Sequence, residues 1–161
     1  MDISIKPSVL RGKLSIPSSK SCAHRAIICA ALAEGESTIS GVSMSKDIEA
    51  TIGAMTALGA HFEVSGDVIK VRGITDDVKN AVIDCNESGS TLRFVIPIAA
   101  ALGADAEFIG RGRLPQRPID IYKRELGRNG VKFLKKKCRI KSQGSLTAVC
   151  MKSRVMFHHS L

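Results

Sequence analysis

The sequence predicts an α/β protein made of repeated βαβαββ units, with one complete unit and most of a second. Segments with helical spacing of apolar residues alternate along the chain with short segments of β-forming residues. Similar residues also recur about 70 positions apart, as in a repeated unit: Ala30 with Ala100, Leu32 with Leu102 and Ile39 with Ile109. The length of 161 residues and the 44% apolar content fit one folded domain.

The first unit is expected to open with a strand at residues 12–16. A helix follows from Lys20, because Ser18 or Ser19 can cap it and Ala23 and Ile27 then share one face. The other expected elements are a strand at residues 37–40, a helix at 47–58 that Gly59 closes, and two strands at 61–64 and 68–71.

The second unit repeats this order. The expected elements are a strand at residues 81–84, a helix at 88–102, a strand at 106–109, a helix at 119–128 and two strands at 131–133 and 139–141.

The composition excludes several classes of protein. No apolar run is long enough to span a membrane, and the start lacks the basic and apolar regions of a signal peptide, so we expect a cytoplasmic protein without a membrane partner. The five Cys include no CxxC pair, which argues against a zinc site or a disulfide framework. We expect them to be buried thiols.

The formal net charge of +9 suggests a nucleic-acid partner, but the charge is unevenly distributed. All 15 Asp and Glu lie at or before Glu125, and the whole basic excess follows it. The basic tail has no repeated basic helix face and no base-stacking aromatic pattern, and the body before it is neutral, so we expect no nucleic-acid partner. A non-enzymatic basic binding module stays an alternative, which a salt titration against random DNA would test.

The first segment with functional potential is the helix start at residues 19–25. Lys20 lies in the first turn, and Ser21 and Arg25 share a helix face. Backbone N–H groups, a hydroxyl and two cations would gather there, which suits a phosphate or a carboxylate. An ordinary capped helix with exposed charges is the alternative, although a basic first turn opposes the helix dipole.

Two further segments combine glycine with polar side chains. Gly89 lies between small hydroxyl residues at a helix start, where a ligand could approach the backbone closely, but neither nucleotide-binding glycine pattern matches. The loop at residues 110–118 carries Arg111, Arg113 and Arg117, and forms either an anion clamp or a solvated loop. His24 is expected to be a packed or surface histidine rather than a base or ligand.

At these three segments the sequence resembles the enolpyruvyl transferase family, and within it the branch whose acceptor is shikimate 3-phosphate. The matching stretches are residues 17–25, 87–93 and 117–119, and the resemblance spans about residues 3–133. The branch that acts on UDP-N-acetylglucosamine is the alternative. It typically has Lys-Asn where this chain has Lys20-Ser21, and it lacks the anion pair of Ser21 and Arg25.

The resemblance implies transfer of the enolpyruvyl group of phosphoenolpyruvate to shikimate 3-phosphate, a step of aromatic amino-acid biosynthesis. It implies that Lys20 contacts both substrates, that Ser21 and Arg25 hold the shikimate phosphate, and that Gly89 and Arg117 bind phosphoenolpyruvate. It implies no metal or organic cofactor and a monomeric full-length protein. Both substrates are polyanions, so cations and N–H dipoles are the expected means of stabilising charge.

The sequence departs from the family in one motif and in length. The family's Asn-(Ala/Ser)-Gly-Thr is here Glu87-Ser88-Gly89-Ser90, and a carboxylate beside a phosphate pocket repels ligand unless it points away. The family chain is also much longer. Its two domains close over the substrates, and its acidic catalytic residues lie in the part that this chain lacks. We therefore assign no catalytic residue to this chain, and we expect the chain to be inactive alone.

The end of the chain is expected to be a separate segment, with the partial enolpyruvyl transferase portion at residues 1–147 and a frameshifted tail at 148–161. A one-nucleotide shift of a permitted back-translation of residues 151–161 encodes Tyr-Glu-Val-Lys-Gly-Asp-Val-Ser-Ser-Gln-Phe. That string resembles the family's next substrate-binding segment. A divergent natural terminus is the alternative.

Overall fold

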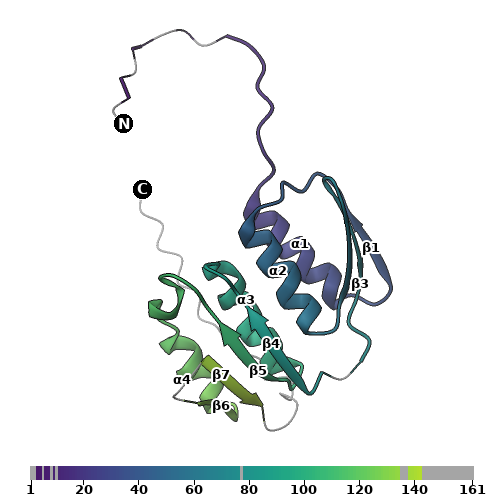
Figure 1. Cartoon of the computed structure of the whole chain (residues 1–161), viewed down its shortest axis with the longest axis vertical. Coiled ribbons are helices and arrows are strands. Elements are labelled where there is room, and N and C mark those ends of the chain that lie inside the picture. The colour runs from purple at the N-terminus through teal and green to yellow at the C-terminus, as the bar shows by residue number, and fades with distance from the viewer. Residues whose placement is uncertain are drawn as a thin grey trace, which may run out of the picture.

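The computed structural model describes residues 3–4, 6–7, 9, 11–76, 78–134 and 138–142, with residues 134 and 138–142 described by their backbone alone. The described chain forms two similar halves (Figure 1). The first contains α1 (Lys20–Leu32), β1 (Glu36–Ile39), α2 (Lys46–Ala57), β2 (His61–Ser65) and β3 (Val68–Arg72). The second contains β4 (Asn80–Asp84), α3 (Gly89–Ala101), β5 (Asp105–Ile109), the 3-10 turn η1 (Leu114–Gln116), α4 (Asp120–Arg128), β6 (Val131–Leu134) and β7 (Cys138–Ser142).

The two halves share one strand arrangement. In the first sheet β3 lies between β1 and β2 and is antiparallel to both. In the second sheet β7 lies between β5 and β6 and is antiparallel to both, and β4 adds a parallel strand at the edge of β5. Corresponding elements begin about 70 residues apart, so the predicted repeat of α/β units is confirmed.

The predicted strand at residues 12–16 is wrong. These residues form no strand in the structure, and the Leu14 and Ile16 side chains are 86% and 81% exposed. Figure 1 shows this part of the chain as an extended arm that leads away from α1. A strand needs a neighbouring strand to pair with as well as alternating apolar residues. Residues 12–16 pair with no strand among the described residues. In the part of the chain that the structure describes, the complete βαβαββ unit is therefore the second one, and the first has no opening strand.

The helices bury the faces that their apolar spacing predicted. α1 and α2 pack side by side against the first sheet, and α2 also contacts α3 and β4, so α2 joins the two halves (Figure 1). The side chains with no exposed surface include at least two from each of the first three helices: Ile27 and Ala31 of α1, Ile48 and Met55 of α2, and Val95 and Ile96 of α3. This shared core fixes the three helix starts relative to one another.

The helix ends follow local sequence signals. A serine caps α1, α2 and α3, with Ser19, Ser45 and Ser88 each accepting a hydrogen bond from the backbone N–H three residues later. Gly59 follows α2 with a φ of +98°, a left-handed conformation that glycine adopts without a Cβ penalty. The cap at Ser19 and the closing Gly59 confirm the sequence prediction, whereas the caps at Ser45 and Ser88 were not predicted.

The cysteine prediction is only partly correct. Cys85 is buried, but Cys22 and Cys29 are exposed on the outer face of α1. Among the described residues, no helix is both long enough and apolar enough to cross a membrane. The expected boundary at residue 147 and the tail beyond it lie outside the described residues.

Candidate functional site

The start of α1 gathers the first three predicted site residues. Lys20 opens the helix, and Ser21 and Arg25 lie one turn apart, with Arg25 Nη1 donating to the Ser21 backbone carbonyl at 2.9 Å. All three are exposed, and the first turn holds no acid. The unsatisfied backbone N–H groups of the helix start thus lie beside two cations, which is an arrangement that attracts an anion.

Contacts with the neighbouring helices orient both cations. Lys20 Nζ lies 2.6 Å from Asp47 Oδ2 in the first turn of α2, and the Lys20 side chain is 55% exposed. The guanidinium of Arg25 lies over the ring of Phe94 on α3, 5.6 Å from its centroid. The two cations are therefore held at the junction of α1, α2 and α3 while their charged groups stay accessible.

The start of α3 brings together the other two predicted residues. Gly89 is the first residue of α3 and is buried. The Arg117 guanidinium lies so close that a Cβ built at Gly89 would overlap it. Only glycine leaves room for the guanidinium in this position. The structure thus brings together Gly89 and Arg117, the two residues that the resemblance assigns to phosphoenolpyruvate, although they are 28 positions apart in the sequence.

Backbone pairing carries the arginine loop, residues 110–118, to the start of α3. The parallel strands β4 and β5 end at the same edge of the sheet. Beyond them Cys85 N–H donates to the Ile109 carbonyl at 2.8 Å, and Arg111 N–H donates to the Asn86 carbonyl at 2.7 Å. The loop after β5 is therefore fastened to the loop that leads into α3, which places Arg117.

Asp84 reinforces this junction. Its carboxylate accepts from the Asn86 backbone N–H at 2.8 Å and pairs with Arg111 Nη2 at 2.8 Å. The Asn86 N–H first, and then the Arg111 guanidinium, hold the pKa of Asp84 below its usual range. Asp84 thus stays ionised and ties the arginine loop to β4.

Glu87, where the sequence departs from the family, is directed to the arginine loop. It is exposed, and its carboxylate lies against Gly112, where an added Cβ would overlap it. Gly112 has a φ of +53°. The carboxylate therefore lies beside the backbone between Arg111 and Arg113.

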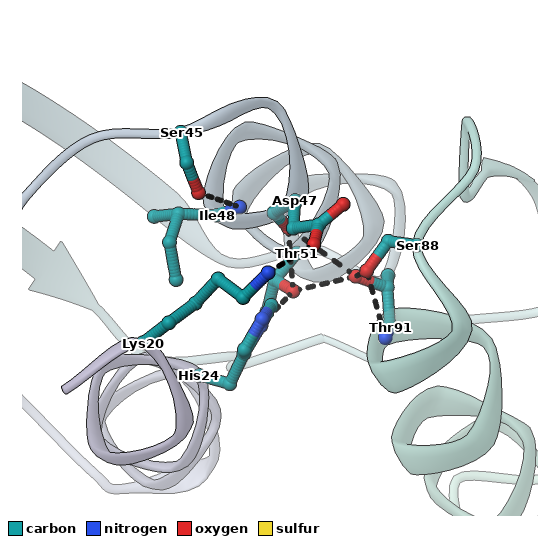
Figure 2. Close-up of polar contacts among 8 residues, drawn as sticks. All are labelled: Lys20, His24, Ser45, Asp47, Ile48, Thr51, Ser88 and Thr91. Atoms are coloured by element: carbon teal, nitrogen blue, oxygen red, sulfur yellow. Dashed lines mark hydrogen bonds and ion pairs between the residues drawn. The ribbon is translucent and has the colours of Figure 1, made fainter. Parts of the chain in front are cut away.

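Sequence reasoning missed a buried polar chain beneath the two helix starts (Figure 2). His24 Nδ1 lies 2.7 Å from Thr51 Oγ1, which lies 2.7 Å from Thr91 Oγ1, and Thr91 Oγ1 donates to Ser88 Oγ at 2.8 Å. Burial lowers the pKa of His24, Asp47 opposes that shift, and Lys20 and Arg25 add to it. His24 is packed, as one of the two predicted outcomes had it.

The signal for this chain was present only as helical spacing. Lys20 and His24 are four residues apart on α1, and Asp47 and Thr51 are four apart on α2, so the two pairs face each other as consecutive contacts. Finding it needed the packing of three helices. Among the described residues, no group of three His, Cys, Asp or Glu could hold a metal ion.

The fold of repeated α/β units and the paired anion-attracting helix starts agree with the enolpyruvyl transferase class that the sequence resembles. The family model for EPSP synthase (3-phosphoshikimate 1-carboxyvinyltransferase) matches residues 5–154. The chain belongs to this family.

Curated relatives named 3-phosphoshikimate 1-carboxyvinyltransferase support the assignment. The relative from Clostridium perfringens (strain SM101) is 52% identical over 120 residues, which cover 73% of this chain and 28% of the relative. The relative from Clostridium beijerinckii is 45% identical over 157 residues, which cover 91% of this chain and 36% of the relative. This chain thus spans about a third of the length of the relatives it matches.

Solved structures show the same fold. A structure of EPSP synthase from Acinetobacter baumannii superposes with a TM-score of 0.71 at 22% identity, over 86% of this chain and 33% of that one. A second, titled as the same enzyme from the same organism, gives a TM-score of 0.69 at 23% identity, over 83% of this chain and 32% of that one.

Proposed function

We propose that this chain supplies the first part of the substrate site of an enzyme that transfers the enolpyruvyl group of phosphoenolpyruvate to shikimate 3-phosphate and releases inorganic phosphate. The observation that carries the proposal is the contact of Arg117 with Gly89, at the start of a helix that also contacts Arg25 of α1 through Phe94. Membership of the family and the names of the relatives support the choice of reaction.

Each of the two helix starts is assigned one anion. Ser21 and Arg25 hold the phosphate of shikimate 3-phosphate, and the backbone of Gly89 with Arg117 holds phosphoenolpyruvate. Lys20 contacts both, since its ammonium group points from α1 toward α2, which lies between the two helix starts. Charge-assisted bonds from Arg and backbone N–H groups are the strong bonds that proteins make to phosphate and carboxylate.

The same groups serve the reaction as well as binding. When inorganic phosphate leaves, the electron pair of the broken C–O bond stays on the phosphate, so negative charge builds on the departing group. Cations and N–H dipoles that are already oriented stabilise such charge without further reorganisation. Asp47 holds Lys20 and Phe94 lies under Arg25, so the cations are oriented before ligand arrives.

We further infer that the chain binds anions but does not turn them over, because about two thirds of the relatives' length is missing from it. Closure around the substrates, which excludes water, needs those parts. The test is phosphate release from phosphoenolpyruvate with shikimate 3-phosphate, beside calorimetric titration of each ligand. We expect binding without turnover. Turnover would contradict the inactive state, and a folded chain that binds neither ligand would contradict the function.

We also infer a cytoplasmic location and a function without nucleic acid, as a monomer in the full-length protein. The neutral charge of residues 1–125, in which the cations of the site are matched by acids elsewhere, supports the absence of a nucleic-acid partner, and membership of the family supports the monomer. A salt titration with random DNA tests this point, and steeply salt-dependent binding would contradict it.

The tail is proposed to be encoded in a shifted reading frame from about residue 148. The absence of acids after Glu125 supports this. The coding DNA tests it, and the proposal fails if no frame encodes Gly-Asp-Val-Ser-Ser-Gln just before the stop codon.

A further inference from the structure

The buried polar side chains of the described residues all belong to one connected chain, which we name the hydroxyl bridge: His24, Thr51, Thr91 and Ser88. Each is at most 2% exposed, and the rest of the described core is apolar. Figure 2 shows the bridge running from α1 through α2 to the start of α3. Its three contacts are 2.7, 2.7 and 2.8 Å long.

Both ends of the hydroxyl bridge lie next to groups of the proposed anion site. His24 directly precedes Arg25 and lies one helical turn after Lys20. Ser88 directly precedes Gly89 and caps α3 by accepting from the Thr91 backbone N–H at 3.2 Å. The bridge is thus a polar connection between the helix that carries the first anion site and the helix that carries the second.

Thr51 is the central member of the hydroxyl bridge. Its single hydroxyl lies within hydrogen-bond distance of His24 Nδ1, Thr91 Oγ1 and the Asp47 carbonyl, the last at 3.2 Å. Asp47 in turn holds Lys20 by its side chain, and its carbonyl also lies 3.4 Å from Thr91 Oγ1. One threonine therefore fixes α1, the first turn of α2 and α3 relative to one another.

Cohesion alone does not explain a polar connection here. His24 Nε2 is buried and has no hydrogen-bond partner among the described residues, which costs stability. Apolar side chains of similar size would join the three helices without that cost. Hydrogen bonds, unlike apolar contacts, also specify register and orientation.

We propose that Thr51 is a positioning residue for the two-anion site, which sets the start of α1 with Lys20 and Arg25 against the start of α3 with Gly89 through the hydroxyl bridge. The proposal rests on the proposed function. Thr51 itself touches neither ligand. Removing its hydroxyl therefore lowers the affinity for both anions through the helices that hold them.

The test is calorimetric titration of the 161-residue chain and its variants with shikimate 3-phosphate and with phosphoenolpyruvate, well below the melting temperature. Thr51→Val removes the hydroxyl and keeps the shape of the side chain. We expect it to lower the affinity for both ligands by about fivefold or more. Thr51→Ser keeps the hydroxyl and restores both affinities to within about twofold.

The matched control is Thr56→Val on the same helix. Thr56 is exposed and donates to the Ile52 carbonyl at 2.9 Å, so this variant removes the same kind of bond to the preceding turn without touching the hydroxyl bridge. Its affinities should equal those of the unchanged chain. If Thr51→Val does not fold, Thr91→Val breaks the bridge from the other side and is assessed in the same way.

The outcomes separate the two proposals. A folded Thr51→Val chain that binds both ligands as well as the unchanged chain overturns the positioning role and leaves the proposed function intact. Loss of thermal stability with unchanged affinities has the same meaning, since it makes the hydroxyl bridge purely structural. An unchanged chain that binds neither ligand overturns the proposed function and the positioning role together.

Discussion

The starts of α1 and α3 differ from the start of α2, which lies between them. All three have a serine cap, but α2 carries Asp47 and Glu49 in its first turn, whereas α1 and α3 carry no acid there. α2 therefore neutralises its own helix dipole, and the other two leave their positive ends for a ligand. The acid of α2 has a second use, because Asp47 holds Lys20 of α1.

The two anion-attracting starts also obtain their cations differently. α1 carries Lys20 and Arg25 on the helix itself, so its cations follow from local sequence. α3 begins with Gly89 and receives Arg117 from a loop that follows β5. The first site is thus fixed by helical spacing and the second by tertiary structure. The predictions below test this difference.

Replacing the cation supplied by the loop should have the largest effect. Arg117→Ala removes the guanidinium that lies beside Gly89. The binding free energy of phosphoenolpyruvate should weaken by about 1.5–3 kcal/mol, which is typical for the loss of a charge-assisted bond. Shikimate 3-phosphate should keep its affinity, because Arg25 and Ser21 are untouched. Calorimetric titration of both ligands measures this. A larger loss for shikimate 3-phosphate would reverse the assignment.

A methyl group at the start of α3 should separate binding from stability. Gly89→Ala places a Cβ where the Arg117 guanidinium lies, and this flexible side chain must move away. We expect the binding free energy of phosphoenolpyruvate to weaken by about 1–2 kcal/mol. The free energy of unfolding should stay constant or rise by less than about 1 kcal/mol, since alanine favours a helix. Urea denaturation beside titration measures both, and unchanged affinity would show that the contact is incidental.

The two serine caps should differ in strength. Ser88 is buried and accepts from both the N–H and the hydroxyl of Thr91, whereas Ser19 makes one exposed bond of 3.4 Å. Ser88→Ala should lower the free energy of unfolding by about 2 kcal/mol and Ser19→Ala by about 0.5–1 kcal/mol. Urea denaturation of both variants decides this, and equal losses would contradict the role given to the buried cap.

The smallest expected effect is a dependence of stability on pH through His24. Its folded-state pKa lies below the ordinary value of about 6.5, so the unfolded chain binds more protons just below that pH. Stability from this group is fully present above pH 6.5 and declines as the pH falls toward the lowered pKa. His24→Asn keeps a partner for Thr51 and should lose this decline. Identical pH profiles of the two chains between about pH 5 and 7 would contradict it.

The elements that the sequence predicted well are those with a complete local signal. The cap at Ser19 and the closing Gly59 have neighbours that decide their structure within one turn of helix. The pairing of Gly89 with Arg117 was reachable only through the family resemblance, because no local pattern links a helix start to a loop 28 residues away.

The predictions from sequence failed where contacts with residues outside the local segment decide the structure. Leu14 and Ile16 alternate as a strand does, but no sheet edge pairs with them in the described chain. Cys22 and Cys29 were expected to be buried from residue type, and they lie on the exposed side of α1. The contact of Thr51 with Thr91 joins residues 40 apart, and only the packing of α2 against α3 brings their hydroxyls together.

The most direct test of the two-anion site is titration of the unchanged chain and of Arg25→Ala with shikimate 3-phosphate and, separately, with phosphoenolpyruvate. Arg25 belongs to the first site, because it donates to the Ser21 carbonyl and its contact with α3 is to Phe94 rather than to Gly89. We predict that the substitution lowers the affinity for shikimate 3-phosphate by roughly tenfold to a hundredfold and changes the affinity for phosphoenolpyruvate by less than about twofold. Equal losses for the two ligands in a folded variant would contradict the division of the site between α1 and α3.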